Sequence, residues 1–162
     1  MDKLPQGGNT MNIKSTRFGE LEVTEELLFK FPHGIPGFPE EKTFIFIPLD
    51  EKSPFAYLQS ATEANLTFLL VDPFAFFRGY EFNLDDEIAK ELGLSEQNLP
   101  QVFLIANSKD NLADMTVNLL APLVINGLNR TGRQVILDNP DYSICHKLFP
   151  DGLPKEAVKG GT

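Results

Sequence analysis

The chain has little of the chemistry that small secreted or metal-binding domains use, with one cysteine, two histidines and no tryptophan in 162 residues. Cys145 has no partner for an intrachain disulfide, and disulfide frameworks usually support small secreted domains. We therefore expect a cytoplasmic protein. Because His33 and His146 begin no cysteine- or histidine-rich spacing, the sequence predicts no tetrahedral metal site.

Long apolar runs are also missing. No stretch approaches the roughly 20 apolar residues that a membrane-spanning helix needs. The N-terminus lacks the basic-then-apolar pattern of a secretory signal. We expect a soluble protein with no membrane partner.

Catalytic motifs are missing as well. The sequence contains no Gly-x-Ser-x-Gly turn and no phosphate-binding glycine loop. Its acidic groups at 50–51 and 85–87 lack the alternating oxygen ligands of a calcium loop. Cys145 stands beside His146, but neighbours in a strand point to opposite faces, so we interpret Cys145 as a small buried hydrophobe. The sequence thus predicts a binding protein that is not an enzyme and needs no cofactor.

Basic residues are scarce, since 14 Lys and Arg face 23 Asp and Glu, giving a formal net charge of -9 and a pI near 4.7. Such a field repels phosphates and anionic lipid and attracts basic surfaces. The basic residues are scattered rather than clustered. Direct binding of nucleic acid is therefore disfavoured.

What the sequence does contain is a series of short runs in which aromatic and branched residues alternate with polar ones, among them 14 Phe. This period of two is typical of half-buried strands. We predict a mainly β, single-domain, barrel-like fold of about ten short, mostly antiparallel strands, with a sandwich as the alternative. The expected strands span 12–16, 19–23, 27–31, 44–47, 56–60, 67–71, 102–106, 115–119, 123–126 and 134–137, the last preceded by a turn at 129–132.

A single short helix is expected at 84–92, where Leu84, Ile88 and Leu92 fall on one face and would lie against the barrel. Asn83 is the predicted N-cap and Gly93 the stop. Residues 1–10 are polar and rich in Gly and Pro, so we interpret them as a disordered leader or cloning remnant. Residues 155–162 are expected to form a flexible tail, which leaves 11–154 as the folded domain.

Two segments are unusual enough to suggest a function. The first, 33–39 (HGIPGFP), combines two prolines, two glycines and apolar residues expected at the surface, although a plain connection between strands would also explain it. The second, 116–126 (TVNLLAPLVIN), is an apolar stretch broken by Pro122 and flanked by Asn118 and Asn126. The alternative for this segment is a pair of core strands bent at the proline, with both amides bonded to backbone groups.

These segments resemble the flagellar assembly factor family FliW, and the likeness runs from about residue 18 to residue 148. It is carried, in order, by Phe31-Pro32-x-Gly34-Ile35-Pro36-Gly37-Phe38, Pro54-Phe55-x-Tyr57-Leu58-Gln59-Ser60, Asp72-Pro73, Tyr80-Glu81, the whole of 116–126, Gly132-x-Gln134-Val135-Ile136-Leu137 and Tyr142-Ser143. Two departures are minor: Tyr57 occupies a position where relatives often carry Trp or Phe, and residues 1–10 have no recognised counterpart.

The resemblance implies a barrel-like protein that binds flagellin in the cytosol and, when flagellin is exported, binds the translational repressor CsrA. Since CsrA blocks translation of flagellin mRNA, this exchange of partners would link export to synthesis. The charge of -9 suggests that the docked protein also repels RNA from CsrA. Neutralising surface substitutions should then change RNA displacement in a salt-dependent way.

Composition and spacing do not identify the residues that touch either partner. Our candidates for one or both surfaces are Ile35, Pro36 and Phe38 of the first segment, with Asn118, Asn126, Asn129 and Arg130 in and after the second. We expect Phe38→Ala to weaken partner binding without lowering the melting temperature.

Two other classes of function remain open at this stage. One is a small enzyme that uses Cys145, His146 or a carboxylate, against which the missing motifs count. The other is a small-ligand-binding barrel in which Phe74, Phe76 and Phe77 line a cavity, although clustered phenylalanines more often fill a β core.

Overall fold

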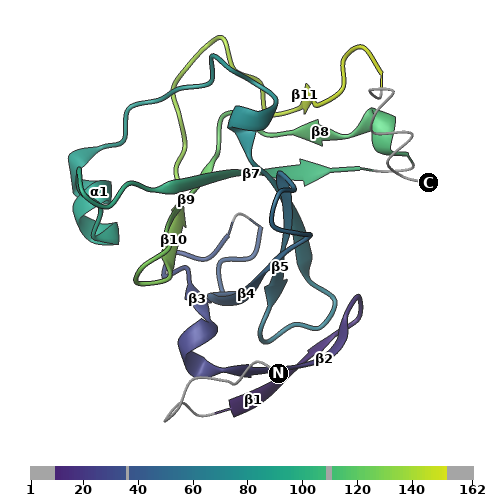
Figure 1. Ribbon diagram of the computed structural model, residues 1–162. Helices are drawn as coiled ribbons and strands as arrows, with labels where there is room; N and C mark the ends of the chain where they lie inside the picture. Colours follow the sequence, from purple (N-terminus) through teal and green to yellow (C-terminus); the bar gives the residue numbers. More distant parts are fainter. Residues whose placement is uncertain (1–9, 36, 109–110, 153–162) are drawn as a thin grey trace.

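The computed structural model describes residues 10–35, 37–108 and 111–152. Within these residues seven strands form a barrel: β3 (Phe29–Lys30), β4 (Thr43–Pro48), β5 (Phe55–Ser60), β6 (Thr67–Val71), β7 (Gln101–Asn107), β9 (Leu123–Asn126) and β10 (Thr131–Gln134). They are hydrogen-bonded in the order β7-β6-β5-β4-β3-β10-β9, and pairing of β9 with β7 closes the ring (Figure 1). Only the β3–β10 pair in this ring is parallel.

The other elements lie on the outside of the barrel. β1 (Thr10–Ser15) and β2 (Gly19–Thr24) form a separate hairpin, drawn below the barrel in Figure 1. β8 (Thr116–Val117) and β11 (His146–Lys147) extend the sheet from β7. One α-helix, α1 (Asp86–Leu92), and three short 3-10 helices, η1 (Glu25–Leu27), η2 (Pro73–Ala75) and η3 (Leu112–Asp114), complete the described residues.

The predicted mainly β barrel is confirmed, and closure through β9 and β7 excludes the sandwich. The predicted strands 67–71 and 123–126 have the observed limits. The strand expected at 134–137 instead spans Thr131–Gln134, because the turn ends at Arg130, two residues before its expected end at 132. The strand expected at 27–31 shrinks to Phe29–Lys30, because η1 takes up 25–27. The two-residue β11 was missed.

The predicted domain limits can be compared with the structure only in part. Thr10, assigned to the leader, is in fact the first residue of β1 and pairs with Thr24. The rest of the leader and the predicted tail lie outside the described residues.

The interior of the barrel is filled by large side chains. Its fully buried cluster consists of Phe31, Ile35, Phe44, Leu58, Leu70, Leu123 and Ile125. The rings of Phe31 and Phe44 meet edge to face, with their centroids 5.6 Å apart. Because these residues come from six separate parts of the chain, the interior cluster ties together the strands that form the ring.

Helix α1 packs on the outside of the barrel, as predicted, with Leu92 buried against Val124 and Val135. The expected cap at Asn83 is wrong, because the helix begins later and Asp85 accepts a hydrogen bond from the Glu87 N–H. The helix ends at Gly93, whose φ of 75° is the left-handed conformation typical of this position.

The segment between β3 and β4 folds back on itself and closes one end of the barrel. Ile35 and Phe38 exchange backbone hydrogen bonds, and Ile35 enters the interior cluster. Gly34 makes this possible, because its φ is +72° and a Cβ there would lie 2.5 Å from the Pro39 carbonyl oxygen. Only glycine fits such an approach of backbone to backbone.

Gly34→Ala and Gly37→Ala form a matched pair that tests this close approach. Both glycines have positive φ, but a Cβ at Gly37 meets nothing within 4 Å. We expect Gly37→Ala to cost about 1 kcal/mol of unfolding free energy through left-handed strain. Gly34→Ala should cost at least about 1 kcal/mol more, because the Pro39 backbone must move. Urea unfolding of both variants measures the difference, and equal losses would contradict it.

Candidate functional site

The structure separates the three candidates of the first segment. Ile35 is 1% exposed, so the expectation that its side chain lies at the surface is wrong: the loop turns it into the barrel. Pro36 lies outside the described residues. Phe38 is 42% exposed and touches the ring of Phe68 edge to face, with centroids 5.7 Å apart. Of these three candidates, Phe38 is therefore the one whose side chain is seen to be available to a partner.

The second segment matches its structural interpretation, a pair of core strands. Val117 and Leu123 to Asn126 are buried, and the Asn118 Oδ1 accepts a hydrogen bond from the Leu120 N–H at 3.0 Å. Asn126, 1% exposed, donates to the Leu92 carbonyl at 2.7 Å and accepts from the Leu128 N–H at 2.9 Å. Its side chain holds α1 against β9 and does not reach the surface.

The remaining two candidates lie near the turn between β9 and β10. The Asn129 amide donates to the Leu92 carbonyl at 3.2 Å and so also holds the end of α1. Arg130, with a φ of 55°, lines an apolar hollow with Phe29 and Phe46 at the end of the barrel opposite Phe38. The seven candidates thus do not form one surface.

A groove runs across the end of the barrel that the Phe38 loop closes. It consists of two adjoining hollows that are both lined by Gln134; we call it the barrel-end groove. The first hollow is lined by His33, Gly34, Ile35, Gly37, Pro39, Gln134 and Ile136. The second is lined by Thr67, Phe68, Leu69, Ile105, Ala106, Asn107, Asn118, Gln134 and Ile144. Ile136 and Ile144 are 73% and 69% exposed, so the groove presents apolar surface to solvent.

Gln134 has an unusual position between the two hollows. Its Nε2 donates to the Ala121 carbonyl at 3.0 Å, but its buried Oε1 has no hydrogen-bond partner within the described residues. A buried acceptor without a donor costs about 1–3 kcal/mol.

An ion-pair network ties the loop of the groove to α1 and β10. His33 Nε2 lies 2.7 Å from Glu91 Oε2, and Arg133 Nη1 lies 2.6 Å from Glu91 Oε1. Partial burial opposes ionisation of Glu91, but the hydrogen bonds from His33 and Arg133 outweigh it and hold the pKa of this carboxyl below its usual value. The network fixes one wall of the groove.

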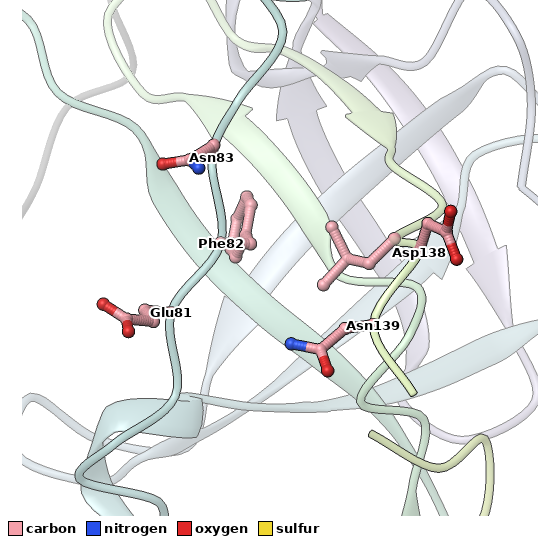
Figure 2. A pocket seen from close by; sticks show the side chains of 6 residues that line it. Glu81, Phe82, Asn83, Asp138 and Asn139 are labelled. Atoms are coloured by element: carbon pink, nitrogen blue, oxygen red, sulfur yellow. The ribbon is translucent and has the colours of Figure 1, made fainter. Parts of the chain in front are cut away.

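Figure 2 shows a second surface feature, which we call the acidic pocket, a hollow of about 470 Å³. It lies between two segments far apart in sequence, and its lining is Glu81, Phe82, Asn83, Leu137, Asp138 and Asn139. Glu81 and Asp138 lie on opposite sides, with Phe82 between them. Carboxylates and amide oxygens around an apolar floor favour a basic group.

Two tyrosines stabilise the walls of the acidic pocket. The Tyr142 hydroxyl accepts from the Glu81 N–H at 3.0 Å and donates to the Glu81 carbonyl at 3.1 Å, joining the two segments. Tyr80 stacks beside Tyr142 with ring centroids 5.0 Å apart, and its hydroxyl donates to the Leu119 carbonyl at 2.7 Å. Burial raises the pKa of Tyr80, and the nearby Tyr142 raises it further.

Several other expectations can be compared with the structure. Cys145 is exposed and follows a turn at Ser143, so its interpretation as buried is wrong. Phe76 and Phe77 pack against a buried hydrophobic cluster outside the barrel interior, whereas Phe74 is 51% exposed. The three side chains therefore do not line one cavity. In the described part of the chain, no group of three or more His, Cys, Asp or Glu could hold a metal ion, and no helix is long and apolar enough to cross a bilayer.

The chain matches the family model described as FliW protein over residues 12–148. The flagellar assembly factor FliW of Desulfitobacterium hafniense (strain DSM 10664 / DCB-2) is 58% identical over 151 residues, covering 93% of this chain and 99% of that protein. The factor of the same name from Bacillus subtilis (strain 168) is 40% identical over 138 residues, covering 85% and 96%. A crystal structure of the flagellar assembly factor FliW has a TM-score of 0.80 at 40% identity, covering 88% of this chain and 100% of that one.

The closed barrel defines a small β-barrel protein with the fold seen in a flagellar assembly factor. The chain belongs to the FliW family.

Most of the groove and pocket residues could not be identified from the sequence. Ile136 stands in the continuous apolar run 135–137, which has no alternation to show that it faces outward. Glu81 and Asp138 are 57 positions apart, and only the fold brings them together.

Replacing Glu91 by Gln tests the loop network through its pH dependence. Because the pKa of Glu91 is lowered in the folded state, its stabilising contribution is present above the unfolded-state value and is lost as the pH falls through the folded-state value. We expect Glu91→Gln to be less stable at neutral pH by about 0.5 kcal/mol, since exposed ion pairs are weak. The deficit should shrink in acid. Thermal unfolding of the wild type and of Glu91→Gln, at neutral and at acidic pH, measures this difference in stability. A difference that does not change with pH would count against the network.

Proposed function

We propose that the protein binds flagellin in the cytosol and, when free of flagellin, binds and antagonises the translational repressor CsrA, relieving repression of flagellin mRNA translation. In this role it is a regulator and chaperone rather than an enzyme. Membership of a family of flagellar assembly factors supports a role in flagellar assembly. The observation that favours two protein partners is the presence of two surface features of different chemistry, the barrel-end groove and the acidic pocket.

The barrel-end groove suits flagellin. A filament subunit held before assembly exposes apolar surface that it later buries against its neighbours, and a chaperone must cover that surface. The exposed side chains of Phe38, Ile136 and Ile144 offer a matching apolar face.

The acidic pocket suits CsrA. A protein that binds RNA carries a basic surface, because it must neutralise phosphates. Glu81 and Asp138 would receive a Lys or Arg side chain from that surface. The net charge of -9 then places a negative field beside the bound repressor, which repels RNA even where the RNA-binding surface stays uncovered.

Phe38→Ala and Ile136→Ser test the groove. Each removes an exposed apolar side chain, so we expect the dissociation constant for flagellin to rise by about tenfold or more. The melting temperature should change little for Ile136→Ser and fall slightly for Phe38→Ala, which loses its edge contact with Phe68. Isothermal titration against purified flagellin measures the affinity.

The matched control for the groove is Leu128→Ser. Leu128 is 77% exposed and lies in the turn at the other end of β10, away from Gln134. It should leave flagellin affinity unchanged. If all three variants bind flagellin equally well, the groove is not the flagellin surface.

Glu81→Gln and Asp138→Asn test the acidic pocket. Each removes one negative charge from the pocket, and losing a charge-assisted hydrogen bond should weaken CsrA binding about tenfold at low salt. The deficit should narrow as salt is added. Glu51→Gln removes the same charge from an exposed turn remote in sequence from the pocket, so an equal effect of all three variants would assign the attraction to net charge alone. Titration in competition with flagellin shows whether the two partners exclude each other.

A further inference from the structure

A third hollow lies beside the turn between β1 and β2, on the wall formed by β5, β6 and β7. Its volume is about 620 Å³, which lies within the usual range for small-molecule sites. Its lining is Thr16, Arg17, Tyr57, Asn65, Thr67, Leu69, Ala106, Asn107 and Ser108. Unlike the acidic pocket, it contains a guanidinium group and no carboxylate; we call it the Arg17 pocket.

The guanidinium of Arg17 is held in place over an aromatic ring. Its Cζ lies 4.8 Å from the centroid of the Tyr57 ring, and its Nη1 donates to the Tyr57 hydroxyl at 3.4 Å. Phe18 supports the same ring edge to face at 5.4 Å. Stacking leaves the other N–H groups of Arg17 oriented and available, because a guanidinium carries five in a fixed fork.

Arg17 makes no ion pair within the described residues, where both ion pairs involve Glu91. Glu63 in the adjoining loop accepts a hydrogen bond from the Asn65 backbone N–H and does not line the pocket. Arg78 and Arg130 also make no ion pair within the described residues, but Arg17 is the one of the three that is stacked on an aromatic ring in a polar pocket, which favours an external anion.

The polar lining has more free donors than free acceptors. Thr67 donates to Gln59 at 2.5 Å and Ser108 donates to the Asn111 carbonyl at 3.1 Å, so these hydroxyl protons are already used. The Tyr57 hydroxyl proton and the side-chain amide N–H groups of Asn65 and Asn107 donate no hydrogen bond within the described residues. A ligand that complements this set is rich in acceptors and carries negative charge.

We propose that the Arg17 pocket binds a small organic or inorganic anion through a phosphate or carboxylate group held by Arg17, Tyr57 and the two amides. Thr67, Leu69, Ala106 and Asn107 line both this pocket and the barrel-end groove. A bound anion therefore lies beside the groove, where it can alter partner binding. The site does not depend on which partner the groove takes.

The experiment is a titration of the full chain with inorganic phosphate, citrate and glucose 6-phosphate at constant ionic strength, followed by amide chemical shifts. We expect saturable shifts at Asn65, Asn107 and Ser108. Arg17→Gln should raise the dissociation constant about tenfold or more, because a hydrogen bond to a charged group is lost. Arg17→Lys should retain part of the affinity, since it keeps the charge without the fork.

Arg78→Gln is the matched control, because Arg78 is exposed and lies outside the pocket. It should bind each probe as the wild type does. If Arg17→Gln proves unstable, Asn107→Asp serves instead: it places a carboxylate in the pocket at an exposed position and should abolish binding. A response to phosphates alone or to citrate alone identifies the preferred group. The absence of saturable shifts with all three probes, or equal weakening by Arg17→Gln and Arg78→Gln, overturns the proposal.

Discussion

The structure depends on the double use of strand β7. Its first half, from Gln101 to Phe103, pairs with β9, and its second half pairs with β6 and with β8. This sharing closes the ring without leaving the β7 backbone unpaired, which removes the open edge that a curled sheet would otherwise expose. It also places Ala106 and Asn107 at the barrel end, where they line both the groove and the Arg17 pocket.

Local sequence patterns predicted the elements well and their assembly poorly. The short apolar run in 67–71 and the four-residue spacing of Leu84, Ile88 and Leu92 reflect forces that act within each segment, so strand and helix were identified correctly. The burial of Ile35 depends on a reversal that only the Gly34 geometry permits. The exposure of Cys145 depends on a turn whose stability comes from Ser143.

The candidate site was harder still, because a side chain's function depends on its neighbours across the fold. Asn126 has the same sequence context as a surface amide, yet it is buried because the end of α1 needs a donor for its last carbonyls. Of the sequence candidates, Ile35 and Asn118 line the groove, and Phe38 adjoins it through its contact with Phe68. The other walls of the groove come from β6, β7 and β10, which no spacing rule connects.

The groove and the acidic pocket meet on one short stretch of chain. Gln134 and Ile136 line the groove, and Leu137, Asp138 and Asn139 line the pocket. In the proposed function, the partner in the groove and the partner at the pocket therefore contact neighbouring residues of the same stretch of chain. Mutual exclusion then needs no rearrangement of the barrel, because a shift of this stretch toward one partner withdraws it from the other.

The stacking of Arg17 on Tyr57 has a spectroscopic consequence. The chain has three tyrosines and no tryptophan, so its ultraviolet emission comes from the tyrosine rings. Tyr57 lies under the guanidinium of Arg17, and Tyr80 and Tyr142 lie behind the acidic pocket. A change near the Arg17 guanidinium alters the fluorescence quenching of Tyr57, whereas a change at the acidic pocket alters that of Tyr80 and Tyr142. The unlabelled protein thus carries its own fluorophores, and a tryptophan on an approaching molecule would receive their excitation energy.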